Sequence, residues 1–290
     1  MTRLHIVTDS GARFANQRLL QQYPVTVVPY QLDIGGTYYR EDVDLSAEDA
    51  MHLIKAQNKP PTIIAPSEEE YAELYANLSR MYDGIISIHT SREISDSWSN
   101  ARRAAQRVSG ACPIITIDSK SVCAGQGMIV KLAGQAALDG LSFDDAVKKV
   151  RDAVDRIFST FYVDTLDYLH VNDIMSESRA ILGAMLKIKP IISMEEGQAI
   201  VTEKVRTRSQ AIDRMIEFLT EFDDLDDAMI IQNRSHITEQ ARQLQDRLSL
   251  EFPGRHFPYT MYGMVLASLL GGEATGVMVL ESELEGFEDG

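Results

Sequence analysis

Disulfides, histidine pairs and long apolar runs are absent from this 290-residue sequence. Its two cysteines, Cys112 and Cys123, are too few for a disulfide framework and are not at a metal-ligand spacing, so we expect buried thiols. Its six histidines form no HxH or HExxH pair, so we expect no metal. No run of about 18 apolar residues occurs, and a strand-like segment stands where a signal peptide would, which predicts a cytoplasmic protein.

Positive charge is also scarce. The chain has 28 Lys and Arg against 43 Asp and Glu, a formal net charge of −15. Because such a field repels phosphate backbones, we expect no nucleic-acid partner. A P-loop and a G-x-S-x-G elbow are missing, and "AGQG" at 124–127 lacks the third glycine of a dinucleotide-binding fingerprint. We therefore expect no cofactor, and we expect Gly125 and Gly127 to permit close helix packing.

The first half of the chain alternates helical patterns with strand-like runs at residues 4–7, 25–34, 85–88 and 113–118. The second of these runs contains Pro29, which predicts a sheet edge or a bend. Helix starts of the capping-box type stand at Ser46, Ser67 and Ser142. This alternation favours a mostly parallel sheet with helices on both faces and ligand sites at the C-terminal strand ends.

The pattern changes after residue 160. Residues 187–205 have two β-prone arms around a Glu-Glu-Gly turn, which predicts a hairpin, and an amphipathic helical pattern follows at 209–222. We therefore predict an α/β fold of two domains, 1–160 with the mostly parallel sheet and 161–290 with a smaller mixed sheet.

Two polar segments are candidate sites. One is the loop after the strand-like run at 85–88, where Thr90, Ser91, Ser95, Ser97 and Ser99 surround Arg92. These groups suit an anion held at a helix N-terminus, but they equally suit simple helix capping. The other is "EKVRTRSQA", where strand alternation would place Lys204, Arg206 and Arg208 on one face, either as an anion site or as a solvated surface.

Several blocks, in order, resemble the DegV family: "IVTDSGARF", "VTVVPYQLDIGGTYYRED", "PPTIIAPSEEEY", "TSREISDSWSNA", "IDSKSVCAGQGM", "DTLDYL", "LKIKPII" and "EKVRTRSQA". The resemblance covers residues 4 to about 212 well and the remainder weakly. It implies a two-domain fold with an apolar tunnel between the domains that holds one long-chain fatty acid. It also implies a binding subunit of bacterial fatty acid kinase, which presents the acyl carboxylate to the separate kinase catalytic subunit and is not an enzyme by itself.

The resemblance also implies site residues, with departures. Ile63 stands where members carry a carboxylate-binding hydroxyl, so Thr62 would have to replace it. Ser91 and Ser95 keep two of the family's serines, but Arg92 replaces another. Leu269 stands where members often have a histidine, and 172–175 replace a "GGRI" segment. We expect a carboxylate site rebuilt around Arg92, with Arg206 or Arg208 in support.

Three alternatives remain. The chain could bind another lipid-like acid without phosphotransfer, or act as a regulator gated by lipid, for which the acidic tail after Leu280 is a hint. It could also be a serine-dependent hydrolase, because His89 lies two positions from Ser91 and alternation would put both on one face.

Overall fold

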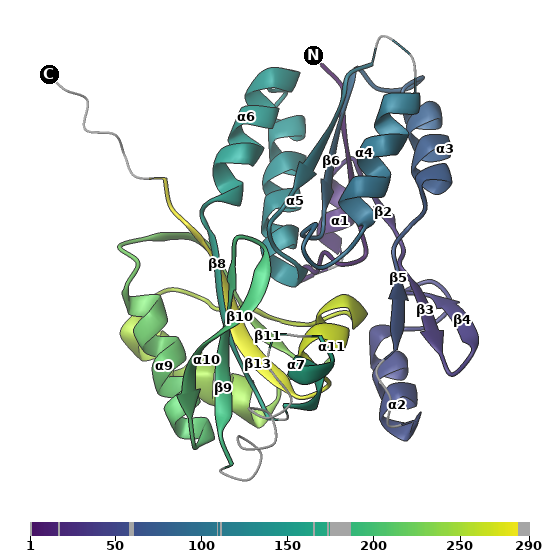
Figure 1. The fold of residues 1–290 in the computed structure, drawn as a ribbon. Coiled ribbons are helices and arrows are strands. Elements are labelled where there is room, and N and C mark those ends of the chain that lie inside the picture. Colours follow the sequence, from purple (N-terminus) through teal and green to yellow (C-terminus); the bar gives the residue numbers. More distant parts are fainter. Residues whose placement is uncertain are drawn as a thin grey trace, which may run out of the picture.

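The computed structural model describes residues 2–16, 18–57, 61–108, 110, 112–164, 166–172, 174 and 187–283. These residues form three β-sheets with helices packed around them (Figure 1). One sheet is parallel, one is mixed and one is small and antiparallel, which confirms the predicted mixture of parallel and mixed α/β architecture.

The first sheet is parallel, with the strands β1 (Leu4–Asp9), β2 (Val25–Val28), β6 (Gly84–His89) and β7 (Ile114–Asp118). Their order across the sheet is β2-β1-β6-β7. Its helices are α1 (Arg18–Gln22), α3 (Glu68–Leu78), α4 (Ser97–Arg107), α5 (Cys123–Leu138) and α6 (Phe143–Val154). Helices α3 and α4 cover one face, and α5 and α6 cover the other (Figure 1). Every residue of β1 and β6 is therefore buried, as expected for central strands of a parallel sheet.

The predicted helix starts are confirmed. The Ser67 hydroxyl accepts a hydrogen bond from the Glu70 amide at 3.2 Å, and the Glu70 carboxylate accepts one from the Ser67 amide at 2.7 Å. These reciprocal bonds are those of a capping box. Ser142 likewise caps α6, and Ser46 stands before α2 (Ala47–Gln57) with its hydroxyl 3.1 Å from the Asp49 amide.

The chain bends at Pro29. Strand β2 is an edge strand of the first sheet, and after the proline the chain enters a separate antiparallel sheet of order β4-β3-β5. Its strands are β3 (Gln31–Ile34), β4 (Thr37–Arg40) and β5 (Thr62–Ile64). The strand-like run at 25–34 is thus two strands in two sheets, because a proline has no N–H to continue a ladder.

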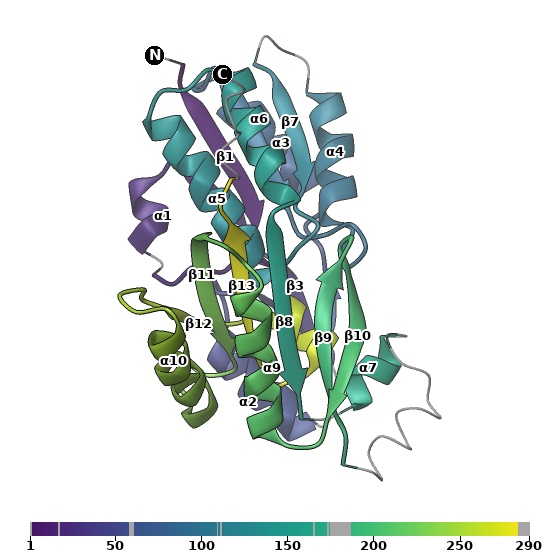
Figure 2. The same cartoon turned by 90° about the vertical axis from the view of Figure 1, so that its left-hand side faces the viewer.

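The second large sheet is mixed, with the strands β8 (Ile157–Val163), β9 (Lys189–Glu195), β10 (Gln198–Val205), β11 (Leu225–Gln232), β12 (Tyr259–Met261) and β13 (Ala274–Glu281). Figure 2 shows them side by side, in the order β10-β9-β8-β13-β11-β12. Strands β9 and β10 are the predicted hairpin. The predicted division at residue 160 falls inside β8.

Helices cover this sheet as well: α7 (Asp167–Val171), α9 (Arg208–Thr220), α10 (Glu239–Glu251) and α11 (Met264–Leu270). One face packs against α9 and α10, and α9 buries the five residues that its helical spacing predicted, Ala211, Ile212, Met215, Ile216 and Leu219. In the described part of the chain, no helix is both long and apolar enough to span a bilayer.

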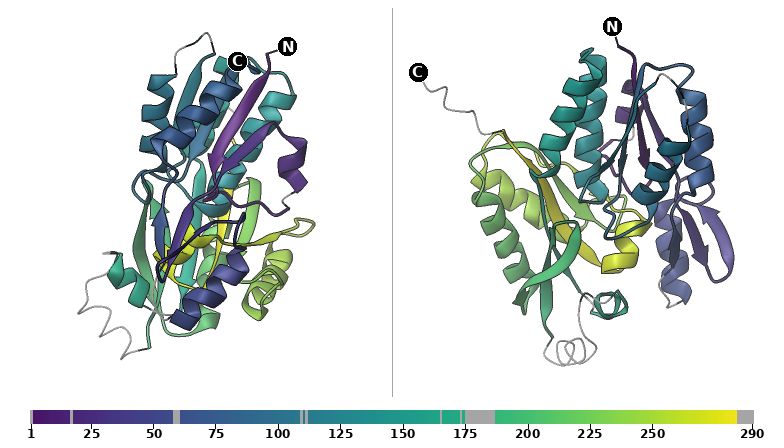
Figure 3. Two further views of the ribbon diagram at one scale, coloured as in Figure 1. Left: turned by 90° about the vertical axis from the view of Figure 1, so that its right-hand side faces the viewer. Right: turned by 45° about the horizontal axis from the view of Figure 1, so that its top comes forward.

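The other face of the second sheet belongs to a core shared by all parts of the molecule, which we call the interdomain core. Its buried members include Leu32 of the small sheet, Phe161 of β8 and Val265 of α11. Helix α11 contacts both β5 and α2 and so packs between the second sheet and the small sheet (Figure 3). The second sheet, the small sheet and helix α5 are therefore joined through continuous apolar packing.

Candidate functional site

A cavity of about 320 Å³ lies beside the loop that follows β6. We call it the rim cavity. Its lining comes from β5 and the residue after it, from the 92–96 loop and from α11, namely Ile63, Ala65, Arg92, Glu93, Ile94, Ser95, Asp96, Val265 and Ser268. Four of these residues, Ile63, Ala65, Ile94 and Val265, also belong to the interdomain core or pack against it. The cavity thus has a polar loop on one side and the apolar core on the other.

Strand alternation decides which residues of β5 reach the rim cavity. Ile63 and Ala65 line it. Thr62, the first residue of β5, lies on the opposite face and is exposed. The Thr62 hydroxyl does not take the place of the hydroxyl that Ile63 displaces. The cavity wall formed by this strand is therefore apolar.

Ser91 is fully buried and lies outside the lining of the rim cavity. Its hydroxyl donates to the Gly197 carbonyl in the β9–β10 turn at 2.8 Å and accepts from the Glu93 amide at 3.2 Å. In the same contact region, Gln198 donates to the Glu93 carboxylate at 3.0 Å. Ser91 thus fixes the cavity loop against the hairpin of the second domain.

Arg92 lines the rim cavity, but its guanidinium lies against carboxylates. Its Nε atom is 3.3 Å from Glu93 Oε1 and 3.5 Å from Asp118 Oδ2, and the side chain is 58% exposed. The guanidinium also lies 5.9 Å from the ring centroid of Trp98. A second cation contacts the same ring, since the guanidinium of Arg102 lies 5.2 Å from the ring centroid of Trp98.

Ser95 is the serine of the loop that lines the rim cavity. Its Oγ atom accepts from the Tyr30 hydroxyl at 2.7 Å and from the Ser97 amide at 3.1 Å. The other lining hydroxyl, Ser268, donates to the Val265 carbonyl of its own helix at 2.8 Å. The capping alternative is partly correct: Ser95 bonds the first amide of α4, but Asp96 occupies the N-cap position and makes no side-chain cap bond.

The remaining predicted residues are apart from the cavity. Arg206 follows β10, at the end opposite to Gln198, roughly 27 Å away at about 3.4 Å per strand residue. The strand ends at Val205, so Lys204 and Arg208 do not share a strand face: Arg208 begins α9 and pairs with Asp164 at 2.8 Å. Leu269 packs against the interdomain core from α11 without lining the cavity.

A buried polar network lies beneath the cavity loop, around Asp9 at the end of β1. The Asp9 carboxylate accepts hydrogen bonds from Ser97 Oγ at 2.6 Å, Thr90 Oγ1 at 2.8 Å and Gln126 Nε2 at 3.0 Å, and it also meets His89 Nδ1 at 3.2 Å. Burial opposes its charge, but the bonds from His89, Ser97 and Gln126 outweigh burial and lower the pKa of Asp9. Asp9 therefore holds the loop as an ionised, fully bonded anchor.

The hydrolase alternative paired His89 with Ser91, but in this network His89 contacts a different serine, Ser87. His89 Nε2 lies 2.7 Å from the hydroxyl of Ser87, its neighbour on the same face of β6, whereas Ser91 bonds elsewhere. Asp9, His89 and Ser87 thus form an acid-base-hydroxyl series, but all three side chains are fully buried, and the Ser87 hydroxyl also bonds Tyr75 at 2.7 Å. A substrate has no access to this serine.

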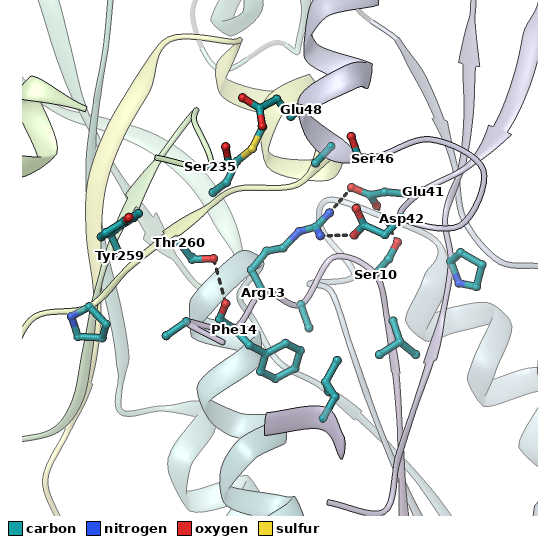
Figure 4. A pocket seen from close by; sticks show the side chains of 18 of the residues that line it. Ser10, Arg13, Phe14, Glu41, Asp42, Ser46, Glu48, Ser235, Tyr259 and Thr260 are labelled. Atoms are coloured by element: carbon teal, nitrogen blue, oxygen red, sulfur yellow. Dashed lines mark hydrogen bonds and ion pairs between the residues drawn. The ribbon is translucent and has the colours of Figure 1, made fainter. Parts of the chain in front are cut away.

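A larger cavity, of about 770 Å³, lies between the β1–α1 loop and the second domain (Figure 4). Arg13 crosses its wall and pairs with Glu41 and Asp42, and the Thr260 hydroxyl donates to the Phe14 carbonyl at 3.0 Å. None of the predicted site residues lines it. Arg13 and Glu41, the buried charges at its wall, are paired with each other.

Some residues of the site were not predicted from sequence. Tyr30 is one of them: it lies 65 positions from the predicted Ser95, and nothing in either segment indicates the hydrogen bond between them. Glu93 and Asp96 stand inside the quoted loop, but their place at the cavity depends on the loop's path. Among the cysteines, Cys123 is buried as expected, and burial raises its pKa to about 12, whereas Cys112 is only half-buried.

Comparison with known proteins gives the family. Residues 3–282 match the model of the DegV family, described as uncharacterised proteins. Protein DegV of Bacillus subtilis is 30% identical over 277 residues, which cover 94% of this chain and 97% of that protein. A DegV domain-containing protein of Listeria monocytogenes is 30% identical over 279 residues, which cover 95% of this chain and 97% of that protein.

Solved structures agree. The fatty-acid-binding DegV family protein of Streptococcus agalactiae superposes with a TM-score of 0.87 at 26% identity, covering 98% of this chain and 100% of that chain. DegV of Bacillus subtilis, a fatty-acid-binding protein, gives a TM-score of 0.84 at 29% identity, with coverage of 97% and 100%. The chain belongs to the DegV family.

Proposed function

We propose that this protein binds one long-chain fatty acid, with the carboxylate in the rim cavity and the acyl chain in the interdomain core. The observation that carries the proposal is the position of the Ser95 hydroxyl, which lines a cavity that it shares with four residues of that core or packed against it. The DegV proteins of Bacillus subtilis and Streptococcus agalactiae, of the same fold, are described as fatty-acid-binding.

The chemistry of the two ends fits a fatty acid. Each CH₂ group that leaves water contributes about 0.8 kcal/mol, so an acyl chain gains from an apolar core. The carboxylate, once taken out of bulk water, needs hydrogen bonds or a counter-ion. Ser95 supplies a donor, and Arg92, on the same loop, supplies a cation that is itself exposed and that Glu93 and Asp118 therefore hold only weakly.

We also propose that the bound acid is presented to a partner kinase, which forms the acyl phosphate. Arg92 and Asp96 are exposed, so a carboxylate at Ser95 would lie close to the protein surface, within reach of a second protein. The side chains of Asp9, His89 and Ser87 are fully buried, so a substrate cannot reach them. In this proposal the chain binds and orients the fatty acid, and the partner kinase catalyses the phosphoryl transfer.

Mass spectrometry of an organic extract of the purified protein tests the binding proposal. We expect a long-chain acyl acid in stoichiometric amount, or, after delipidation, binding of added hexadecanoic acid followed through the fluorescence of Trp98, the only tryptophan. Recovery of no acyl acid, together with no binding on addition, would sink the proposal. The presentation step has its own test. The kinase that the loaded protein captures is mixed with that protein, ATP and hydroxylamine, and we expect the acyl phosphate to be trapped as an acyl hydroxamate. Absence of the hydroxamate would contradict presentation while leaving the binding proposal intact.

One observation favours a second candidate, a lipid whose head group is not a simple carboxylate. Glu93 and Asp96 line the rim cavity together with Arg92, so the charged lining carries one more negative than positive charge. A neutral or hydroxylated head group would meet less repulsion there. Tighter binding of hexadecan-1-ol than of hexadecanoic acid would favour this candidate.

A further inference from the structure

Ser95 receives two hydrogen bonds at the same oxygen. The Tyr30 hydroxyl donates to Ser95 Oγ at 2.7 Å, and the Ser97 amide donates to it at 3.1 Å. A serine hydroxyl has two lone pairs and one proton, so both lone pairs are engaged and only the proton is left. Within the described ranges, no hydrogen bond from this proton to a protein acceptor occurs, and Ser95 lines the rim cavity.

We propose that Tyr30 is a positioning residue, which fixes the Ser95 hydroxyl as a hydrogen-bond donor to the ligand head group and thereby selects head groups that accept a hydrogen bond. This inference rests on the proposed function and adds a specificity determinant to it. Without the Tyr30 hydroxyl, Ser95 can rotate and turn a lone pair to the cavity instead.

The Tyr30 ring has no freedom to release its bond. The side chain is fully buried in the interdomain core, directly after the bend at Pro29. Its amide donates to the Ser10 hydroxyl at 2.9 Å, and its carbonyl accepts from the Glu41 amide at 2.9 Å. The hydroxyl is therefore delivered to Ser95 by a backbone that is held on both sides.

The Tyr30 hydroxyl is also protonated, as its bond to Ser95 requires. Burial, followed by the nearby charge of Asp9, holds the pKa of Tyr30 well above its usual range, so the hydroxyl keeps its proton at neutral pH. The second donor is equally constrained, because the Ser97 hydroxyl donates to Asp9 at 2.6 Å and pairs with the Tyr71 hydroxyl at 2.7 Å. The buried anchor thus holds the amide that completes the Ser95 site.

The consequence is a rule about ligands. A carboxylate accepts a hydrogen bond from Ser95, and a charge-assisted bond of this kind is stronger than a neutral one. An alkyl ammonium cannot accept at all, so its affinity owes nothing to the Ser95 proton. Tyr30 therefore raises the affinity for a carboxylate relative to the affinity for an alkyl ammonium.

A double-mutant cycle on the delipidated full chain tests this inference, with hexadecanoic acid and hexadecan-1-amine as probes. We expect Ser95→Ala to raise the Kd of the acid about tenfold and Tyr30→Phe to raise it several-fold. We expect the double variant to match Ser95→Ala alone, since Tyr30 acts through Ser95. The Kd of the amine should stay within about twofold in Ser95→Ala and in the double variant, and it should not rise in Tyr30→Phe, where the freed Ser95 lone pair can accept from the ammonium.

Tyr162→Phe is the matched control, because this buried tyrosine lies in the separate core under α9 and α10. It should leave the Kd of the acid unchanged, and its thermal midpoint calibrates the stability effect of losing a buried hydroxyl. An unchanged Kd in Tyr30→Phe, or additive losses in the double variant, would overturn the inference while leaving the proposed function intact. Failure of the unmutated chain to bind hexadecanoic acid would overturn both.

Discussion

At the scale of single residues, the site combines features that sequence could and could not supply. Ser95 and Arg92 were predicted because they stand in one loop after a strand that reads as buried. The direction of the Ser95 proton depends on Tyr30, which belongs to another segment, and no local pattern encodes such a contact. Thr62 was predicted as a ligand, but one residue of alternation in β5 turns it away from the rim cavity and presents Ile63.

Replacement of Arg92 separates charge from shape at this site. We expect Arg92→Ala to raise the Kd of hexadecanoic acid by roughly three- to tenfold and to leave that of hexadecan-1-ol unchanged, since only the acid carries a charge to pair. Titration calorimetry with both probes measures the difference. Arg102→Ala is the control, because Arg102 shares the contact with Trp98 but does not line the cavity. Equal losses for acid and alcohol would refute charge pairing.

At the scale of elements, hydrophobic periodicity predicted most of what the structure contains. The buried face of α9, the capping boxes and the β9–β10 hairpin follow from patterns within 20 residues of sequence. The small sheet was not predicted. Its β3–β4 hairpin has a local signal, the Gly35-Gly36 turn, which our sequence prediction of one strand at 25–34 overlooked. Strand β5 comes from a distant segment and pairs with β3 through no local signal. The predicted hairpin ends at Val205, as β10 does, so the alternation expected for Lys204, Arg206 and Arg208 was wrong because it ran past the end of the strand.

The glycines of α5 provide a test at this scale. A Cβ added at Gly127 would lie 2.0 Å from the Arg13 carbonyl oxygen, a backbone atom that cannot move aside cheaply. We expect Gly127→Ala to destabilise the protein by roughly 2 kcal/mol despite the better helix propensity of alanine. Urea unfolding measures it against Gly110→Ala, where an added Cβ meets nothing within 4 Å and we expect little change. A stabilised Gly127→Ala would contradict the close packing that we infer.

At the scale of the whole molecule, a buried cluster of charges fastens the two domains. Arg13 pairs with Glu41 and Asp42, and the Glu41 carboxylate also accepts from the Met264 amide at 2.7 Å, at the start of α11. Burial raises the pKa of Glu41, although the charge of Arg13 opposes this shift. Sequence marks these residues as ordinary charged loop positions, since their partners lie up to 223 residues away.

Loss of Arg13 should therefore cost much more than loss of an exposed arginine. We expect Arg13→Met to lower the free energy of unfolding by about 3 to 5 kcal/mol, because Glu41 stays buried without its counter-charge. Addition of Glu41→Gln should recover part of this loss. Arg40→Met, which breaks an exposed pair with Asp44, should leave the free energy of unfolding nearly unchanged in the same denaturant titration. Similar costs for the two arginines would show that the cluster contributes no special stability.

The order of strands in the second sheet has a consequence for how the protein is made. Strand β13 lies between β8 and β11, which do not pair with each other, so it alone joins the half formed by β8, β9 and β10 to the half formed by β11 and β12. A ribosome releases β13 after all of these. The emerging chain can complete its first sheet early, but the second remains in two unpaired parts, with open strand edges, until β13 inserts. The interdomain core, in which we propose that the acyl chain binds, is thus among the last features of the molecule to form, since β13 supplies Ala274, Met278 and Leu280 to it.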